Sequence, residues 1–77
     1  MPRAFILVNV EPGEEEQALK LLKSLEGVEE SYVTYGVYDL MVRVKADTMD
    51  ELKDIVTHKI RSFKQIRSTL TLIMMEE

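Results

Sequence analysis

A short stretch near the middle of the chain, residues 34–40, holds more polar and aromatic chemistry than a simple connection between strands requires. It contains Tyr35, Gly36, Tyr38 and Asp39, and Asp39 is the first aspartate of the chain. Because glycine adopts positive φ at little steric cost, the backbone can turn at Gly36 and bring neighbouring amides close to another molecule. Such amides donate to a carboxylate, while an aspartate accepts from an ammonium group. We therefore interpret the stretch as the candidate binding site.

Each of these residues also has a purely structural interpretation. Gly36 could serve only the turn, and Asp39 could hydrogen-bond only the amides of its own loop, as aspartate does in many turns. Tyr35 and Tyr38 suit packing at a subunit interface better than stacking on a ligand. Both interpretations stay open at the level of the sequence.

The elements around this stretch follow from the spacing of apolar residues, which predicts the order strand, helix, strand, strand, helix, strand. The expected strands are residues 3–10, 30–35, 38–44 and 66–75, and the expected helices are residues 14–25 and a segment that starts at Thr48. Thr48 and Glu51 have capping-box spacing, in which the threonine hydroxyl accepts from the amide three residues later. The order is that of the ferredoxin-like βαββαβ fold of the α+β class, a four-stranded antiparallel sheet with both helices on one face. In this fold the first strand lies between the third and the fourth.

One face of the expected sheet has no cover within the chain, because two helices cover only the other face. Phe5 and Leu7 of the first strand and Leu72 and Met74 of the last strand are expected on the uncovered face. An apolar sheet face is rarely left in water, so we expect a second copy of the chain to cover it in an isologous dimer. The alternative is a monomer with scattered exposed apolar residues.

The composition limits the chemistry available to the chain. At 77 residues we expect a single domain, residues 1–77. With no cysteine and one histidine, neither a metal site nor a cofactor is expected. The net charge is -4 and the basic residues are scattered, so direct nucleic-acid binding is not expected. No apolar run approaches the roughly 20 residues of a membrane span and no signal peptide is visible, so we expect a cytoplasmic protein without a membrane partner.

A catalytic role is not expected either, because no general base or nucleophile is visible in a suitable setting. The single histidine, His58, follows a surface pattern on the second helix, and no buried pair of carboxylates appears in the sequence. We therefore predict that the chain is not an enzyme.

Four segments carry a resemblance to a known family: residues 4–10 followed by Glu11-Pro12-Gly13, then Leu25-Glu26-Gly27-Val28, then Gly36-Val37-Tyr38-Asp39-Leu40, and finally Ile66-Arg67-Ser68-Thr69-Leu70-Thr71. In this order and at this spacing they resemble the effector-binding domain, or RAM domain, of the Lrp/AsnC transcription regulators. The resemblance covers about 70 of the 77 residues.

The resemblance implies a module that binds a small effector, typically an amino acid, between subunits, and dimers that assemble further into an octamer or decamer. Regulators of this family carry an N-terminal helix-turn-helix, whereas this chain begins at the first strand. The resemblance therefore implies a stand-alone module that modulates transcription by joining full-length DNA-binding relatives.

The resemblance also implies that hydroxyls of the last strand reach the pocket, from the same or another subunit, although these threonines could equally face water. A free amino acid carries a carboxylate and an ammonium group, which the loop amides and Asp39 would suit. The expected ligand-binding residues are Tyr35, Gly36, Val37, Tyr38, Asp39, Ser68, Thr69 and Thr71.

Three other functions stay open. Regulatory modules of the ACT type share this topology but are normally fused to an enzyme. Small dimeric α+β-barrel enzymes curl such strands around a cavity. A purely structural adaptor would cap oligomers of relatives without any effector.

Overall fold

The computed structural model describes residues 1–74 and confirms the predicted α+β fold. Its elements are β1 (Arg3–Val10), α1 (Glu15–Lys23), β2 (Val28–Val33), β3 (Leu40–Lys45), α2 (Met49–Asp54), the π-helical turn η1 (Ile55–Lys59) and β4 (Ile66–Met74). Met75, expected at the end of the last strand, lies outside the described residues. The four strands pair antiparallel in the order β2-β3-β1-β4, so β1 is flanked by β3 and β4 as predicted.

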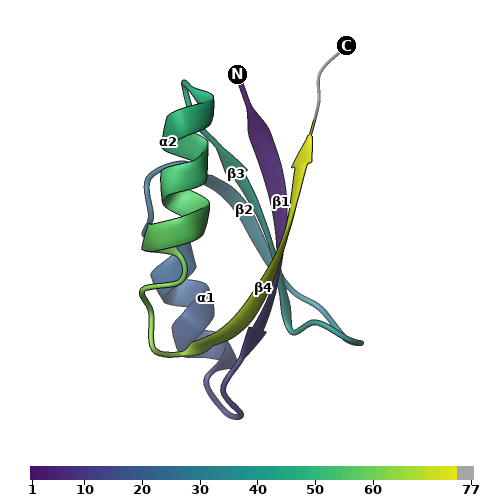
Figure 1. Cartoon of the computed structure of the whole chain (residues 1–77). Helices are drawn as coiled ribbons and strands as arrows, with labels where there is room; N and C mark the ends of the chain where they lie inside the picture. Colours follow the sequence, from purple (N-terminus) through teal and green to yellow (C-terminus); the bar gives the residue numbers. More distant parts are fainter. Residues whose placement is uncertain (75–77) are drawn as a thin grey trace.

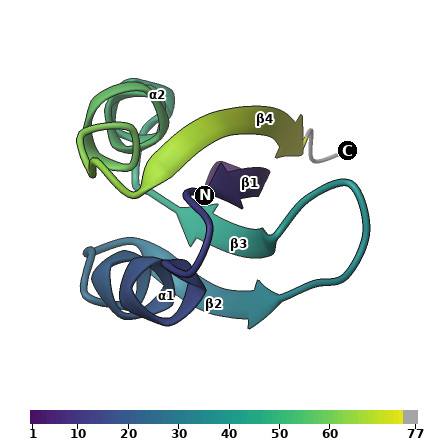
Figure 2. The same ribbon diagram turned by 90° about the horizontal axis from the view of Figure 1, so that it is seen from below.

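Both helices lie on the same face of this sheet (Figure 1, Figure 2). Alternate residues of the two central strands point beneath the helices, because side chains of a strand alternate between its faces. Their fully buried side chains include Ile6 and Val8 of β1 and Val42 of β3. The helices contribute Ala18, Leu22, Leu52, Ile55 and Ile60 to the same core.

Helix α1 ends sooner than its apolar spacing predicts, at Lys23 rather than near residue 25. The Ser24 hydroxyl donates to the Leu21 carbonyl at 2.6 Å, and Gly27 then turns the chain with a φ of 98°. The Gly27 carbonyl accepts from the Lys45 amide at 2.8 Å, which ties the end of this turn to the end of β3.

Helix α2 begins as predicted, since the Thr48 hydroxyl accepts from the Glu51 amide at 3.1 Å. The π-helical turn that follows was not predicted. In it the Ile60 amide donates to the Ile55 carbonyl at 2.9 Å, a spacing of five residues instead of four. The wider turn keeps both Ile55 and Ile60 in the core.

The second face of the sheet carries no element of the described chain, as the sequence predicted. The side chains of Phe5, Leu7 and Met41 are half-buried there, while Leu70 and Leu72 of the edge strand β4 are 43% and 50% exposed. Phe5 pairs with Leu72, and Leu7 with Leu70, so these apolar side chains lie next to one another. We call this surface the open face.

Candidate functional site

The loop between β2 and β3, residues 34–39, is longer than the sequence predicted. The expected strands 30–35 and 38–44 end and begin two residues closer to the turn than β2 and β3 do. The Thr34 amide donates to the Asp39 carbonyl at 2.9 Å, and the Thr34 hydroxyl donates to the Tyr38 carbonyl at 2.7 Å. These two bonds close the base of the loop and leave its tip free of the sheet.

The tip of this loop projects into solvent. Tyr35 is 99% exposed and Val37 is 84% exposed. Gly36 between them has a φ of 142°, and no atom lies within 4 Å of where a Cβ would stand. The loop extends away from both helices (Figure 1, Figure 2). An exposed aromatic and an exposed aliphatic side chain at such a tip suit contact with another molecule.

Asp39 ties the loop to β1. Its carboxylate Oδ2 accepts from the Val10 amide at 2.9 Å, and its own amide donates to the Val8 carbonyl at 2.9 Å. Asp39 is thus bonded on both sides, to Thr34 across the loop and to Val8 and Val10 of β1. Asp39 therefore has the loop-shaping role that the sequence left open, while contact with a ligand stays a prediction.

The three hydroxyl residues of β4 do not converge within the chain. Thr69 pairs with Val8 and Thr71 with Ile6, whose side chains are buried under the helices, so both threonines are on the helix-covered face. Ser68 points to the open face, where its hydroxyl accepts from the Asn9 side-chain amide at 3.3 Å. The sheet thus separates Ser68 from the two threonines.

Thr69 and Thr71 line a groove of about 320 Å³ between β4 and the second helix. The helical side of the groove presents side chains from α2, from η1 and from the turn that follows it. The lining residues are Leu52, Lys53, Val56, Thr57, Arg61, Thr69, Thr71 and Ile73. The predicted ligand-binding residues did not include Lys53, Thr57 or Arg61, and their four-residue spacing along the second helix is the one signal that could have grouped them.

The groove and the loop lie on opposite sides of the sheet. The groove is on the helical side, whereas the loop extends away from the helices (Figure 1, Figure 2). The predicted ligand-binding residues of residues 35–39 and those of β4 therefore do not form one pocket within a single chain.

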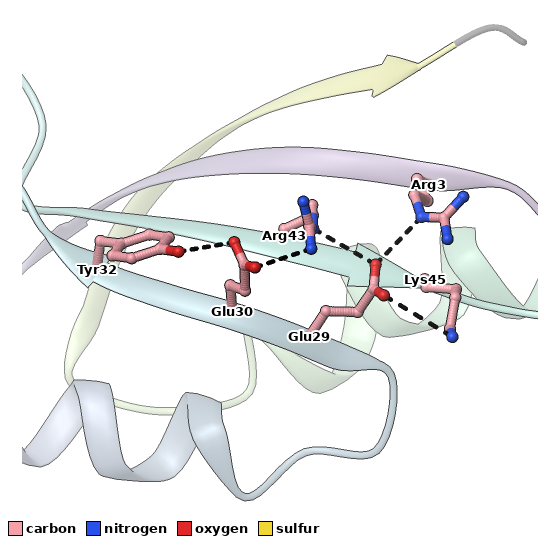
Figure 3. Close-up of polar contacts among 6 residues, drawn as sticks. All are labelled: Arg3, Glu29, Glu30, Tyr32, Arg43 and Lys45. Atoms are coloured by element: carbon pink, nitrogen blue, oxygen red, sulfur yellow. Dashed lines mark hydrogen bonds and ion pairs between the residues drawn. The ribbon is translucent and has the colours of Figure 1, made fainter.

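A network of charged side chains occupies one end of the open face, and Figure 3 shows its members. Glu29 pairs with Arg3 at 3.2 Å, with Arg43 at 3.5 Å and with Lys45 at 3.8 Å. Glu30 accepts from Arg43 at 2.9 Å and from the Tyr32 hydroxyl at 2.7 Å. The bond to Glu30 raises the pKa of Tyr32 above its ordinary value, because the bond is lost when the phenol ionises.

A second cleft, of about 440 Å³, lies between the turn before β2, the end of β3 and the second helix. Its volume exceeds that of the groove, but none of the predicted ligand-binding residues lines it. Within residues 1–74, no group of three or more His, Asp or Glu side chains is placed to hold a metal ion. None of the helices in that part of the chain combines the length and apolar character that a membrane span requires.

The fold and the groove define a small α+β module with a solvent-exposed loop and a cleft at the lower end of the roughly 300–1,000 Å³ typical of small-molecule sites. Residues 3–77 match the family model of the Lrp/AsnC ligand binding domain. The chain belongs to the Lrp/AsnC family.

The relatives agree with this assignment. The regulatory protein AsnC of Escherichia coli K12 is 37% identical over 59 residues, which cover 77% of this chain and 39% of AsnC. The chain thus spans about two fifths of the length of the curated relatives that it matches first. AsnC is a regulatory protein by name, and a further relative from Pyrococcus abyssi is named an HTH-type transcriptional regulator, which argues against an enzyme.

Solved structures share the fold. The crystal structure of FFRP-DM1 is 40% identical, with a TM-score of 0.94 over 97% of this chain and 100% of that chain. A transcriptional regulator of Neisseria meningitidis, NMB0573, solved as a complex with L-methionine, has a TM-score of 0.84 over 99% of this chain and 51% of that chain. At 14% identity that likeness concerns the fold alone.

Proposed function

We propose that the chain is an amino-acid-sensing and oligomerisation module, in which an effector binds between two copies. One copy contributes the loop of residues 34–39, and the other contributes the groove that contains Thr69 and Thr71. The position of the loop carries this proposal. Its tip, with Tyr35 almost fully exposed, points away from the groove of its own chain and is free to meet the groove of a neighbour.

The chemistry of the loop suits the two groups that every amino acid presents. The amides of Gly36, Val37 and Tyr38 can donate to the α-carboxylate, since no side chain shields the backbone at Gly36. The other carboxylate oxygen of Asp39, Oδ1, can accept from the ammonium group while Oδ2 remains bonded to the Val10 amide. The L-methionine complex of NMB0573 supports an amino-acid ligand for this fold.

The open face supports assembly of the module with itself. Its apolar part, made by Phe5, Leu7, Leu70, Leu72 and Met41, is the kind of surface that a second copy covers. Met74 of β4 pairs with Arg3 and continues the same face. A dimer formed in this way would leave both loops and both grooves available for a higher oligomer, such as the predicted octamer or decamer.

The transcriptional role would be indirect. The chain would join full-length DNA-binding relatives through the same surfaces and pass the state of the effector site to them. The names of the curated relatives, which are regulators, support this role.

Isothermal titration with each of the twenty amino acids tests the binding function. We expect heat from a small subset of them and loss of that heat in two variants, Gly36→Ala in the loop and Thr69→Val in the groove. Gly36→Ala should disturb the loop alone, because its new Cβ meets no atom within 4 Å while a φ of 142° is strained for alanine; the loop backbone should shift and the sheet and helices should stay intact. Absence of heat for every amino acid at millimolar concentration would contradict the proposed function.

A mixture of the two variants tests whether the site is shared between copies. After subunit exchange at equal amounts, about a quarter of the sites should combine an intact loop with an intact groove and regain binding. If each variant alone loses binding but the exchanged mixture recovers none, the site lies within one chain and the shared arrangement is wrong.

A further inference from the structure

The groove between β4 and the second helix has an unusual balance of charge for this protein. The chain carries a net charge of -4, yet the residues that line the groove include Lys53 and Arg61 and no aspartate or glutamate. Within residues 1–74, neither cation has a carboxylate within 4.0 Å. The nearby Asp54 is bound to His58 at 3.0 Å. The groove is therefore a local positive site on an acidic molecule.

The helix geometry aligns these groups. Lys53, Thr57 and Arg61 are four residues apart, and in a regular α-helix such side chains drift by about 40° per step because each residue turns about 100°. The π-helical turn η1 is wider, so it turns less per residue and opposes this drift. Lys53, Thr57 and Arg61 consequently line the same side of the groove.

The opposite wall adds hydroxyl groups. Thr69 and Thr71 of β4 are half-buried, and no side-chain hydrogen bond engages either hydroxyl within the described part of the chain. Together with Thr57 they provide donors around a floor made partly by Val56. The two cations and three hydroxyls can bind a carboxylate, and the apolar floor can contact a short aliphatic chain that carries it.

We propose that the effector of this chain is a dicarboxylic amino acid of the aspartate or glutamate type, whose side-chain carboxylate binds Lys53 and Arg61 in the groove. This inference rests on the proposed function, because the loop of a neighbouring copy holds the α-carboxylate and the ammonium group. Arg61 supplies a planar fork that binds a carboxylate through two parallel bonds, and Lys53 supplies a point charge.

Matched ligands test the charge preference. L-aspartate and L-glutamate differ from L-asparagine and L-glutamine only at the side-chain terminus, so their affinities in isothermal titration report on the groove. We expect the acid of one pair to bind about tenfold to hundredfold more tightly than its amide, and this advantage to shrink as salt is raised.

Variants locate the effect. Lys53→Met and Arg61→Met remove the charge but keep an aliphatic side chain. Each should remove most of the difference in affinity between the acid and its amide, whereas Arg61→Lys should retain part of this difference. Lys20→Met on the exposed surface of α1 makes the same change in net charge outside the groove and should leave the advantage unchanged.

Three results would overturn this inference. Neutral or basic amino acids that bind at least as tightly as the acids would show that the groove does not select a carboxylate, although the proposed function would stand. Equal weakening of acids and amides by Arg61→Met would place the α-carboxylate in the groove instead. Absence of binding by every amino acid would overturn the proposed function together with the inference.

Discussion

Asp39 is the residue at which the structural and the functional interpretations of the loop can be separated. One carboxylate oxygen is committed to the Val10 amide, which belongs to the last residue of β1. A carboxylate has further lone pairs, so a ligand could be bound without breaking this contact. The stability of Asp39 variants therefore reports on the bond to Val10, and their affinity for the effector reports on contact with the ligand.

We expect Asp39→Ala to lower the free energy of unfolding by about 1–3 kcal/mol, because it leaves the part-buried Val10 amide without its acceptor. Asp39→Asn keeps an acceptor oxygen and should cost less. Urea denaturation at a fixed protein concentration measures both. Asp47→Ala, at an exposed position, is the control and should change stability little.

The result also bears on the binding role. If Asp39→Asn keeps the stability of the original chain but loses the effector, the carboxylate contacts the ligand as well as the loop. An Asp39→Ala variant as stable as the original would instead show that the bond to Val10 does not hold the loop.

At the scale of elements, the junction between α1 and β2 depends on close packing at one glycine. A Cβ on Gly27 would stand 2.8 Å from the Lys45 carbonyl oxygen and 2.9 Å from Cδ1 of Ile55. Gly27 also has a φ of 98°, which other residues rarely adopt. The end of α1, the end of β3 and the second helix therefore meet at this one position.

We expect Gly27→Ala to destabilise the fold by about 2–5 kcal/mol, since backbone strain and overpacking add together. Gly13→Ala is a matched control: its φ of 83° is also positive, but no atom lies within 4 Å of the new Cβ. It should cost about 1–2 kcal/mol, the backbone strain alone. Thermal unfolding of the two variants side by side checks the difference, and equal losses would mean that the close contact at Gly27 relaxes freely.

At the scale of the whole molecule, the open face decides how copies assemble. Leu72 is half exposed, pairs with Phe5 and has no cover in the described chain. In an isologous dimer every substitution occurs twice at the interface, so an unfavourable charge there acts from both copies.

We expect Leu72→Glu to weaken the proposed dimer at least about a hundredfold and to shift sedimentation equilibrium toward the 8.9 kDa monomer. Val37→Glu places the same charge on an exposed apolar residue of the loop tip and should leave this dimer intact. The melting temperature of the original chain should rise with protein concentration, whereas that of Leu72→Glu should not. An original chain that sediments as a monomer at micromolar concentration would contradict the dimer itself.

Local chemistry determined most of the fold. The alternation of β1, the capping contact of Thr48 with Glu51 and the order of the elements involve residues close in sequence, so their spacing predicted them. The separation of Ser68 from Thr69 and Thr71 within one chain also follows from strand alternation, and the place of all three hydroxyls in a pocket shared between subunits stays a prediction.

Only the tertiary structure decided the shape of the candidate site. The contact that ties the base of the loop to β1 joins Asp39 and Val10, which are 29 residues apart. The groove brings Lys53 and Arg61 beside Thr69 and Thr71 because α2, η1 and β4 pack on one another, and the π-helical turn has no clear mark in the spacing of apolar residues. The sequence by itself thus determined the four strands, the start of each helix and the position of the loop. The groove and its charge came from long-range packing, since a pocket wall is shared by residues that only folding brings together.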